Sequence, residues 1–230
     1  MDPRQSTFTG ISIQVSLSGY SFKVQTPAGV ETSNGWLGPD RLFTTPEFLR
    51  RYDGVEISLL TPKVALVPEA FYHASQARAA LSEVASLEDT DFVETVNVPS
   101  LAAVLIFSNT IGESLSKVLA QTVLPASGTP VRVLPEMYYL LRELENLKEY
   151  NKIVASWYDG WLHLVIAQGR SLNLANVFQA PDFTTAQYFL FLGMKRLQLN
   201  PEVSTVCWRT PLPPDAEMSL YRYFKSVVQL

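Results

Sequence analysis

The sequence predicts an α/β protein of two similar halves, residues 9–126 and 127–230, each a mixed β-sheet with flanking helices. Two amphipathic hairpins with the same alternating pattern recur about 140 residues apart, which indicates a diverged duplication. The order strand, proline, acidic residue, helix also occurs at three junctions along the chain. The Ala-Ser-Gly stretch at residues 126–128 is the expected boundary between the halves.

The first half begins with a hairpin of two half-buried strands. Apolar and polar residues alternate from residue 11 to residue 18, and this period of two is typical of a strand with one face in a core. Gly19 supplies the turn, and the alternation continues to Val24. We therefore expect two paired strands at the start of the first sheet.

The second half contains the matching hairpin between Ile153 and Ile166. Its centre is Asp159-Gly160, a pair that tolerates the positive φ angles of a two-residue turn. Residues 171–178 then supply a third strand. The two halves are thus expected to begin their sheets in the same way.

The remaining elements follow from apolar runs and helix-start signals. Short apolar runs predict strands over residues 63–67, 101–107 and 203–208. Proline suits the first helical position, and the helix dipole favours an acidic residue beside it. These signals predict helices over residues 68–87, 110–121, 135–150 and 182–199, and from residue 215 to the carboxyl end.

Composition excludes several classes of function. The net charge of −4 and the pI near 5.3 argue against a nucleic-acid binder, which needs clustered Lys and Arg to displace counterions. Cys207 is the only cysteine, so no intrachain disulfide can form and a reducing compartment is permitted. The densest apolar run, residues 101–107, is far shorter than the roughly 20 residues of a membrane span. With no signal peptide evident, we expect a cytoplasmic protein.

The order of elements from Val131 to Ile166 resembles the actin-like ATPase superfamily, which includes sugar kinases and bacterial cell-shape and pilus-assembly proteins. The whole chain is similar to a bacterial family of uncharacterised proteins, domain-of-unknown-function family 3822, with that fold in divergent form. Three features carry this closer similarity: Pro68-Glu69 after a strand, Leu134-Pro135-Glu136, and the aromatic helix over residues 183–191. The resemblance implies two ribonuclease-H-like halves.

The resemblance also implies where nucleotide contacts would lie, and the first phosphate loop is altered. In the superfamily this loop carries a metal-coordinating Asp, followed by glycine and small hydroxyl residues. The corresponding stretch here includes Ser16, Ser18 and Gly19, with one glycine and no carboxylate. Serine cannot supply the negative charge that holds a metal ion for phosphoryl transfer.

The second phosphate loop is altered in the same way. In an ungapped alignment with the family pattern, its first Asp becomes Ser156 and its second becomes His163. The glycine run becomes Tyr158-Asp159-Gly160, and the threonine becomes Trp161. Asp159-Gly160 is therefore interpreted as a hairpin turn, with a salvaged metal ligand as the alternative.

The third nucleotide element of the superfamily is a pair of glycines after the last strand, where the adenosine packs. Here Trp208 and Arg209 occupy that stretch, and neither glycine is present. Because all three elements are altered together, we expect that the cleft no longer binds ATP conventionally. We expect no catalytic residue, no metal site and no cofactor.

Other candidate residues favour structure over chemistry. His73 and His163 lack metal-ligand spacing to each other or to Cys207, so each is interpreted as a structural histidine. Three aromatics, Trp157, Tyr158 and Trp161, crowd one hairpin. They are interpreted as core residues, with partner-binding anchors as the functional alternative.

Two hypotheses of function follow. The first is a non-catalytic, pseudo-ATPase scaffold or protein-interaction module that binds an unknown protein partner or itself. The second is an ATP-dependent enzyme or nucleotide switch with relocated phosphate contacts, which would need Asp159 and a basic residue such as Arg170 or Lys195 in the cleft. A small-ligand pocket in the remnant cleft is a third possibility. The sequence favours the scaffold.

Overall fold

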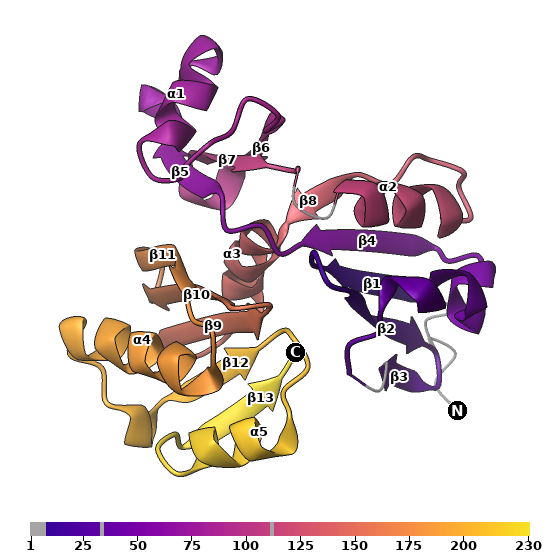
Figure 1. Ribbon diagram of the computed structural model, residues 1–230. Helices are drawn as coiled ribbons and strands as arrows, with labels where there is room; N and C mark the ends of the chain where they lie inside the picture. The colour runs from indigo at the N-terminus through magenta and orange to yellow at the C-terminus, as the bar shows by residue number, and fades with distance from the viewer. Residues whose placement is uncertain (1–7, 33–34, 111–112) are drawn as a thin grey trace. The chain divides into compact units, whose positions relative to one another are not determined.

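The computed structural model describes residues 8–32, 35–110 and 113–230 (Figure 1). Its internal contacts divide the chain into two compact units. The first unit combines residues 1–59 with residues 111–134, and the second combines residues 60–110 with residues 135–230. The first unit is therefore built from two separate stretches of the chain.

The first unit is built on a five-stranded sheet of order β3-β2-β1-β4-β8. Strand β1 pairs antiparallel with β2 and parallel with β4, and helix α2 packs on β4. The strands are β1 (Gly10–Val15), β2 (Tyr20–Thr26), β3 (Gly29–Thr32), β4 (Gly54–Leu59) and β8 (Val133–Pro135), and the helices are η1 (Pro39–Thr44), η2 (Pro46–Leu49) and α2 (Glu113–Thr122). Residues 111 and 112 of the predicted helix 110–121 lie outside the described part of the chain.

The second unit contains a five-stranded sheet of order β11-β10-β9-β12-β13, which repeats the order of the first. Its strands are β9 (Asn151–Tyr158), β10 (Trp161–Gln168), β11 (Ser171–Gln179), β12 (Thr205–Trp208) and β13 (Ser226–Gln229). Its helices are α3 (Glu136–Asn146), α4 (Phe183–Arg196), η6 (Pro201–Val203) and α5 (Pro214–Tyr221). Both sheets thus combine an antiparallel meander with parallel strands, and the predicted mixed α/β class is confirmed.

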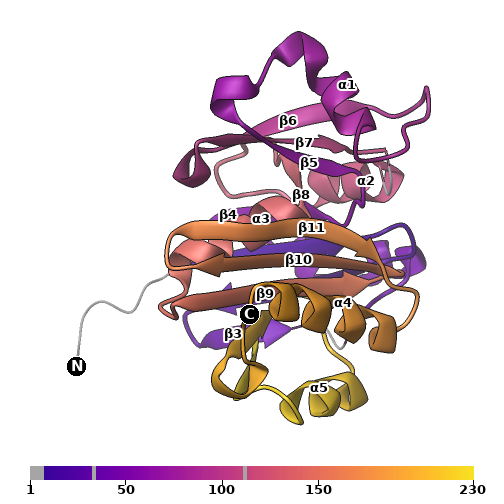
Figure 2. The same cartoon turned by 90° about the vertical axis from the view of Figure 1, so that its left-hand side faces the viewer.

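Helices α3 and α4 cover opposite faces of the second sheet (Figure 2). Side chains alternate between the faces along each strand. On β10, Leu162, Leu164 and Ile166 join the buried cluster of α4, whereas His163 and Val165 point to the α3 side. The predicted cap of α4 is confirmed, because the Asp182 carboxylate accepts a hydrogen bond from the Thr185 N–H at 2.7 Å.

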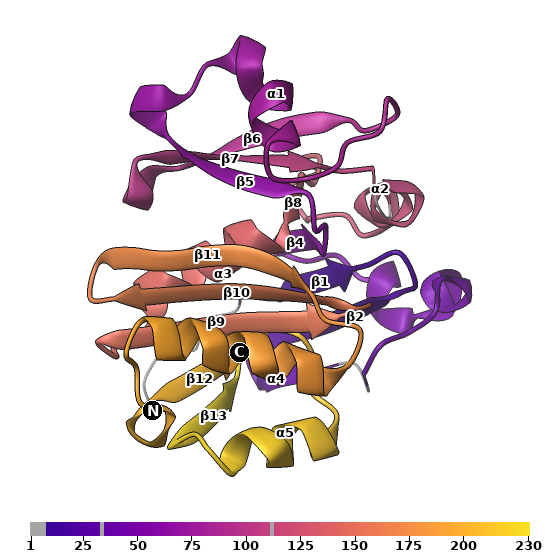
Figure 3. The ribbon, with the colours of Figure 1, turned by 60° about the vertical axis from the view of Figure 1, so that its left-hand side comes forward.

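A three-stranded antiparallel sheet, β5-β7-β6, completes the second unit (Figure 3). It consists of β5 (Val64–Pro68), β6 (Val93–Val98) and β7 (Ala103–Ser108), with η5 (Pro99–Leu101) between the last two. Helix α1 (Ala77–Ser82) packs on this sheet through Ala77 and Leu81. The predicted strands at residues 63–67 and 101–107 are confirmed within two residues.

Two predicted helices are wrong. The single helix predicted over residues 68–87 is broken into η3 (Glu69–Phe71), η4 (Ala74–Gln76) and α1. Most residues from 69 to 76 are exposed, so helix propensity there has no packing to support it. The helix predicted to reach the carboxyl end stops at Tyr221, because the β-branched pair Val227-Val228 pairs with β12 as strand β13.

Strand β8 shows that sequence order and sheet membership differ. It follows residue 127, the predicted start of the second half, yet it lies beside β4 in the first sheet.

Within the described residues, no helix is both long and apolar enough to cross a membrane.

Candidate functional site

The turn between β1 and β2 uses its own polar groups internally. Ser16 donates its backbone N–H to the Gly19 carbonyl at 2.9 Å, and its hydroxyl donates to the same carbonyl at 3.3 Å. The Ser18 N–H in turn donates to Ser16 Oγ at 3.3 Å. Because Ser16 is 1% exposed, its hydroxyl is committed to holding the turn.

Gly19 is explained by a close approach of backbone. Tyr20 and Leu37 exchange two backbone hydrogen bonds, of 2.9 and 2.7 Å. A Cβ atom on Gly19 would lie 2.3 Å from the Leu37 carbonyl oxygen, a contact that no side chain can make. The glycine that survives in this loop therefore has a structural reason that is independent of phosphate binding.

The second hairpin closes with a two-residue turn, as predicted. Asp159 has φ 56° and Gly160 has φ 79°, and Tyr158 pairs directly with Trp161. These angles belong to the turn type whose twist matches paired strands. Across the described residues, no three His, Cys, Asp or Glu side chains are grouped closely enough to hold a metal ion.

A buried polar cluster lies at the α3 face of this hairpin. The Ser156 hydroxyl donates to Glu136 Oε1 at 2.6 Å, and the Arg209 guanidinium pairs with Glu136 Oε2 at 2.7 Å. Ser156 and Glu136 are 0% exposed, and Arg209 is 8% exposed. The guanidinium also lies over the Tyr139 ring, 4.9 Å from its centroid. The structure thus brings together Ser156 and Arg209, from two separate predicted nucleotide loops, through a carboxylate on α3.

His163 faces Ser156 across the β9–β10 pair and is fully buried. Neither ring nitrogen has a hydrogen-bond partner in the part of the chain that the structure describes. Burial lowers the pKa of His163 to about 4, and the nearby Glu136 charge opposes this shift only in part. The imidazole is therefore neutral at pH 7.

The segment after β12 is held by its own side chains. Thr210 Oγ1 accepts hydrogen bonds from the Trp157 backbone N–H and from Trp208 Nε1, both at 2.9 Å. The Trp208 side chain is completely buried. The residues that stand in place of the expected glycine pair thus form part of the core of the second unit.

Gln229 closes the same segment from β13. Its side-chain amide donates to the carbonyl oxygens of Trp208 at 2.9 Å and Thr210 at 3.0 Å. The Arg209 N–H donates to the Ala155 carbonyl at 2.9 Å. The backbone of residues 208–210 is therefore bonded from β9 on one side and β13 on the other.

The three aromatics of the hairpin are all half-buried, and Trp157 packs against the core of the second unit. Trp157 donates its indole N–H to the Ala180 carbonyl at 2.8 Å, and its ring lies 5.4 Å from the Phe183 ring. This packing supports the core interpretation for Trp157. Tyr158 and Trp161 flank the turn and are half-buried. Their role in binding a partner stays a prediction.

No sequence pattern identified the residues that hold this site together. Glu136 was visible only as an acidic residue at a helix start, and its partner Arg209 is 73 residues away. Thr210 and Gln229 carried no signal, because their bonds depend on the sheet order. Of the predicted site residues, Ser16, Ser18 and Gly19 belong to the first unit, and Ser156, Asp159, Gly160, Trp208 and Arg209 belong to the second.

Comparison with known proteins assigns the family. The family model described as "Protein of unknown function (DUF3822)" matches residues 1–227. The chain belongs to this family. No curated protein matches the sequence significantly.

The solved structures that match this DUF3822 chain include two that share its fold over nearly its whole length. The first is a Bacteroides thetaiotaomicron VPI-5482 protein with an actin-like ATPase fold and unknown function, at 17% identity and a TM-score of 0.68 over 100% of this chain and 93% of that one. The second is the PilM-PilN type IV pilus biogenesis complex, at 10% identity and a TM-score of 0.52 over 96% of this chain and 88% of that one. The predicted family and the actin-like ATPase fold are confirmed.

The close approach at Gly19 predicts the effect of adding one methyl group. Gly19→Ala should lower the free energy of unfolding by about 1–3 kcal/mol, because the clash is with backbone that cannot rotate away. Leu17→Ala in the same turn is the matched control and should change stability by less than about 0.5 kcal/mol, since Leu17 is 73% exposed. Urea denaturation measures both, and equal stabilities would contradict the structural role.

The Glu136–Arg209 pair predicts strong coupling. Arg209→Met should cost about 3–5 kcal/mol, because it leaves the Glu136 carboxylate buried without its cation. The double variant Glu136→Gln/Arg209→Met should lose clearly less than the sum of the single losses. The exposed Arg196 provides a control, Arg196→Met, with little expected effect. Additive losses in urea denaturation would show that the two side chains act independently.

His163 predicts a pH dependence of stability. Its folded pKa of about 4 lies below the ordinary value of 6.5, so the unfolded chain takes up the proton first as pH falls. The contribution is complete above pH 6.5, and about 2 kcal/mol of it should be lost between pH 7 and pH 5. His163→Leu should remove this part of the dependence, whereas His73→Leu, at the exposed histidine, should retain it. Identical pH profiles of unfolding for the two variants would refute the assignment.

Proposed function

We propose that this chain is a non-catalytic actin-like scaffold, a pseudo-ATPase that binds a protein partner or another copy of itself. The observation that carries the proposal is the buried cluster of Glu136, Ser156 and Arg209. In this cluster the residues at two predicted nucleotide loops are bonded to the protein's own carboxylate. Their hydrogen-bonding capacity is directed inward.

Access to the expected metal positions supports the same conclusion. Ser156 and His163, which stand where the superfamily pattern has its two carboxylates, are both 0% exposed. Catalysis of phosphoryl transfer depends on positioning a metal ion and the phosphates together. A neutral hydroxyl and a neutral imidazole, both without contact to solvent, are unsuited to that task.

The segment expected to receive adenosine is also closed. Trp208 fills the core beside Phe183, at 5.7 Å between ring centroids, and Gln229 bonds the carbonyls that follow it. Bare glycine backbone would let a base approach, whereas this segment presents a packed indole and bonded carbonyls. The side-chain packing therefore favours a protein that uses the fold without the nucleotide.

A partner role has support of two kinds. Tyr158 and Trp161 are half-buried beside the turn, and aromatic side chains of this kind often anchor interfaces. Trp157 lies on the other face of the hairpin, where its indole bonds to the Ala180 carbonyl. One similar structure is a complex of type IV pilus biogenesis, so this fold also occurs in assemblies with another protein.

The structure weighs against the relocated ATP site. Asp159 and Arg170 flank opposite ends of the eight-residue strand β10, roughly 27 Å apart along it. Asp159 lies near the start of α4, since the Gly160 carbonyl accepts from the Ala180 N–H, whereas Lys195 lies in the last turn of that helix, roughly 20 Å along its axis. Neither basic residue is placed to share a phosphate with Asp159.

Nucleotide binding provides the test. The full chain should show no change in thermal or urea unfolding with Mg-ATP, ADP or GTP. A nucleotide present at about a hundredfold over its Kd would add about 2.7 kcal/mol of stability, which either method detects. A saturable increase with Mg-ATP would overturn the proposal. If Asp159→Ala then abolished this stability increase and the exposed control Asp215→Ala retained it, the protein would be assigned as a nucleotide switch.

A further inference from the structure

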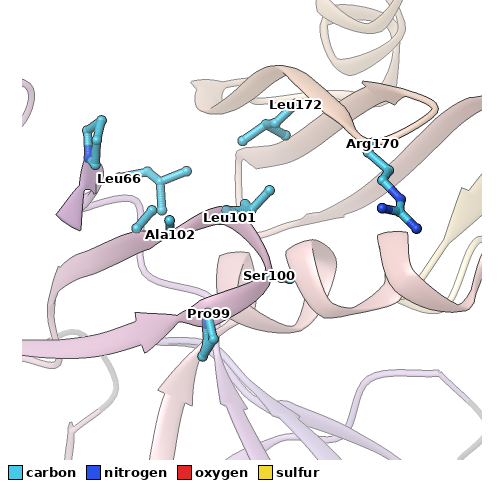
Figure 4. Close-up of a pocket in the computed structure, with 9 residues that line it drawn as sticks. Leu66, Pro99, Ser100, Leu101, Ala102, Arg170 and Leu172 are labelled. Carbon is cyan, nitrogen blue, oxygen red and sulfur yellow. The ribbon is translucent and has the colours of Figure 1, made fainter. Parts of the chain in front are cut away.

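A pocket of about 510 Å³ lies within the second unit, between the outer edge of its three-stranded sheet and the start of β11 (Figure 4). Its walls come from β5, from η5 and the residue after it, and from the start of β11. Leu66, Leu101 and Leu172 form its apolar lining, and Arg170 reaches its rim. Its volume is in the range of roughly 300–1,000 Å³ typical of ligand sites.

Two sheet edges meet at this pocket. Strand β5 is the outer strand of the order β5-β7-β6, and β11 is the outer strand of the order β11-β10-β9-β12-β13. An edge strand presents backbone N–H and C=O groups that no neighbouring strand uses. Such an edge accepts an added strand from another chain.

The hydrogen-bond pattern between β5 and β7 shows which backbone N–H and C=O groups of β5 are not used by β7. The Ser108 N–H donates to the Lys63 carbonyl at 3.0 Å, and the Glu69 N–H donates to the Ala102 carbonyl at 2.8 Å. In an antiparallel pair the bonded residues alternate, so Ala65 and Val67 also bond to β7. The N–H and C=O of Leu66 therefore point away from β7, toward the outer edge of this sheet, and its side chain lines the pocket.

Arg170 gives the pocket its charge. It occupies the two-residue turn between β10 and β11 and is exposed. Its guanidinium forms no hydrogen bond or ion pair with any other described residue, and no acidic side chain lines the pocket. A planar guanidinium is suited to bidentate pairing with a carboxylate. The pocket thus combines an apolar lining, a backbone edge and an unpaired cation.

We propose that this pocket binds an extended peptide that adds to the edge of β5, places an apolar side chain between Leu66, Leu101 and Leu172, and pairs a carboxylate with Arg170. The backbone edge favours a peptide over an acyl chain. A fatty acid would cover the N–H and C=O of Leu66 without bonding them, whereas a peptide strand satisfies both. The site lies apart from the aromatic hairpin, and the inference does not depend on the loss of ATP binding.

Selection from a phage-displayed library of random peptides on the immobilised full chain tests the inference. The recovered peptides should place an Asp, Glu or free carboxyl terminus close to an apolar residue. Fluorescence anisotropy of a labelled, selected peptide then measures affinity for the variants. Arg170→Ala should weaken binding about tenfold or more, whereas Arg196→Ala, on the exposed surface of α4, should leave it unchanged.

A pair of substitutions at one position tests the backbone edge. Leu66→Ala removes apolar contact only, whereas Leu66→Pro also removes the outward N–H. Because that N–H does not bond to β7, proline should be tolerated there, and urea denaturation of both variants checks this. We expect Leu66→Pro to bind the peptide more weakly than Leu66→Ala by about fivefold or more.

Several outcomes would overturn the inference. These are the recovery of no peptide, equal binding by Arg170→Ala and wild type, or peptides whose binding depends on Trp161 and not on Arg170. Binding of decanoate to the chain, together with the recovery of no peptide, would reassign the pocket to an acyl carboxylate. If Leu66→Pro unfolds the chain, the Arg170 comparison alone decides, because Arg170 is exposed and forms no hydrogen bond or ion pair with another described residue.

Discussion

The ion pair between Glu136 and Arg209 is the contact on which the carboxyl end of the second sheet depends. It joins the first turn of α3 to the segment after β12, and Ser156 adds a bond from β9. A buried pair stabilises little by itself, since desolvation offsets much of the attraction. Removing one partner, however, leaves the other charge buried and uncompensated. The pair therefore fixes how these three elements meet. A nucleotide that used Arg209 would first have to break this pair, and one that used Ser156 would have to break its hydrogen bond to Glu136.

Much of the fold could be predicted because its signals are local. Period-two alternation identified both hairpins, and Asp159-Gly160 identified the turn between β9 and β10. The two wrongly predicted helices also rested on local signals, which tertiary packing overrode. Alanine-rich residues near 77 predicted a long helix, but little of that segment is buried. The segment after Tyr221 continued a helical pattern, but pairing with β12 made it a strand.

At the candidate site, the sequence shows which residues of the superfamily pattern are absent, but it does not show which contacts take their place. Missing glycines and carboxylates can be seen in the sequence at residues 16–19 and 156–163. What fills their place depends on pairs far apart in the chain, such as Glu136 with Arg209 and Gln229 with the carbonyls of 208–210. The peptide site proposed here is invisible for a related reason. An edge strand can be identified only when the order of strands in the sheet is known.

The placement of β8 beside β4 bears on how the chain is made on the ribosome. The first sheet is complete only after residue 135 has been synthesised, by which time all three strands β5, β6 and β7 already exist. Until then the outer side of β4 is an unpaired edge, which another nascent chain could join. Slow translation between residues 60 and 132 would prolong that exposure, so codon choice in this interval should influence the yield of correctly folded protein.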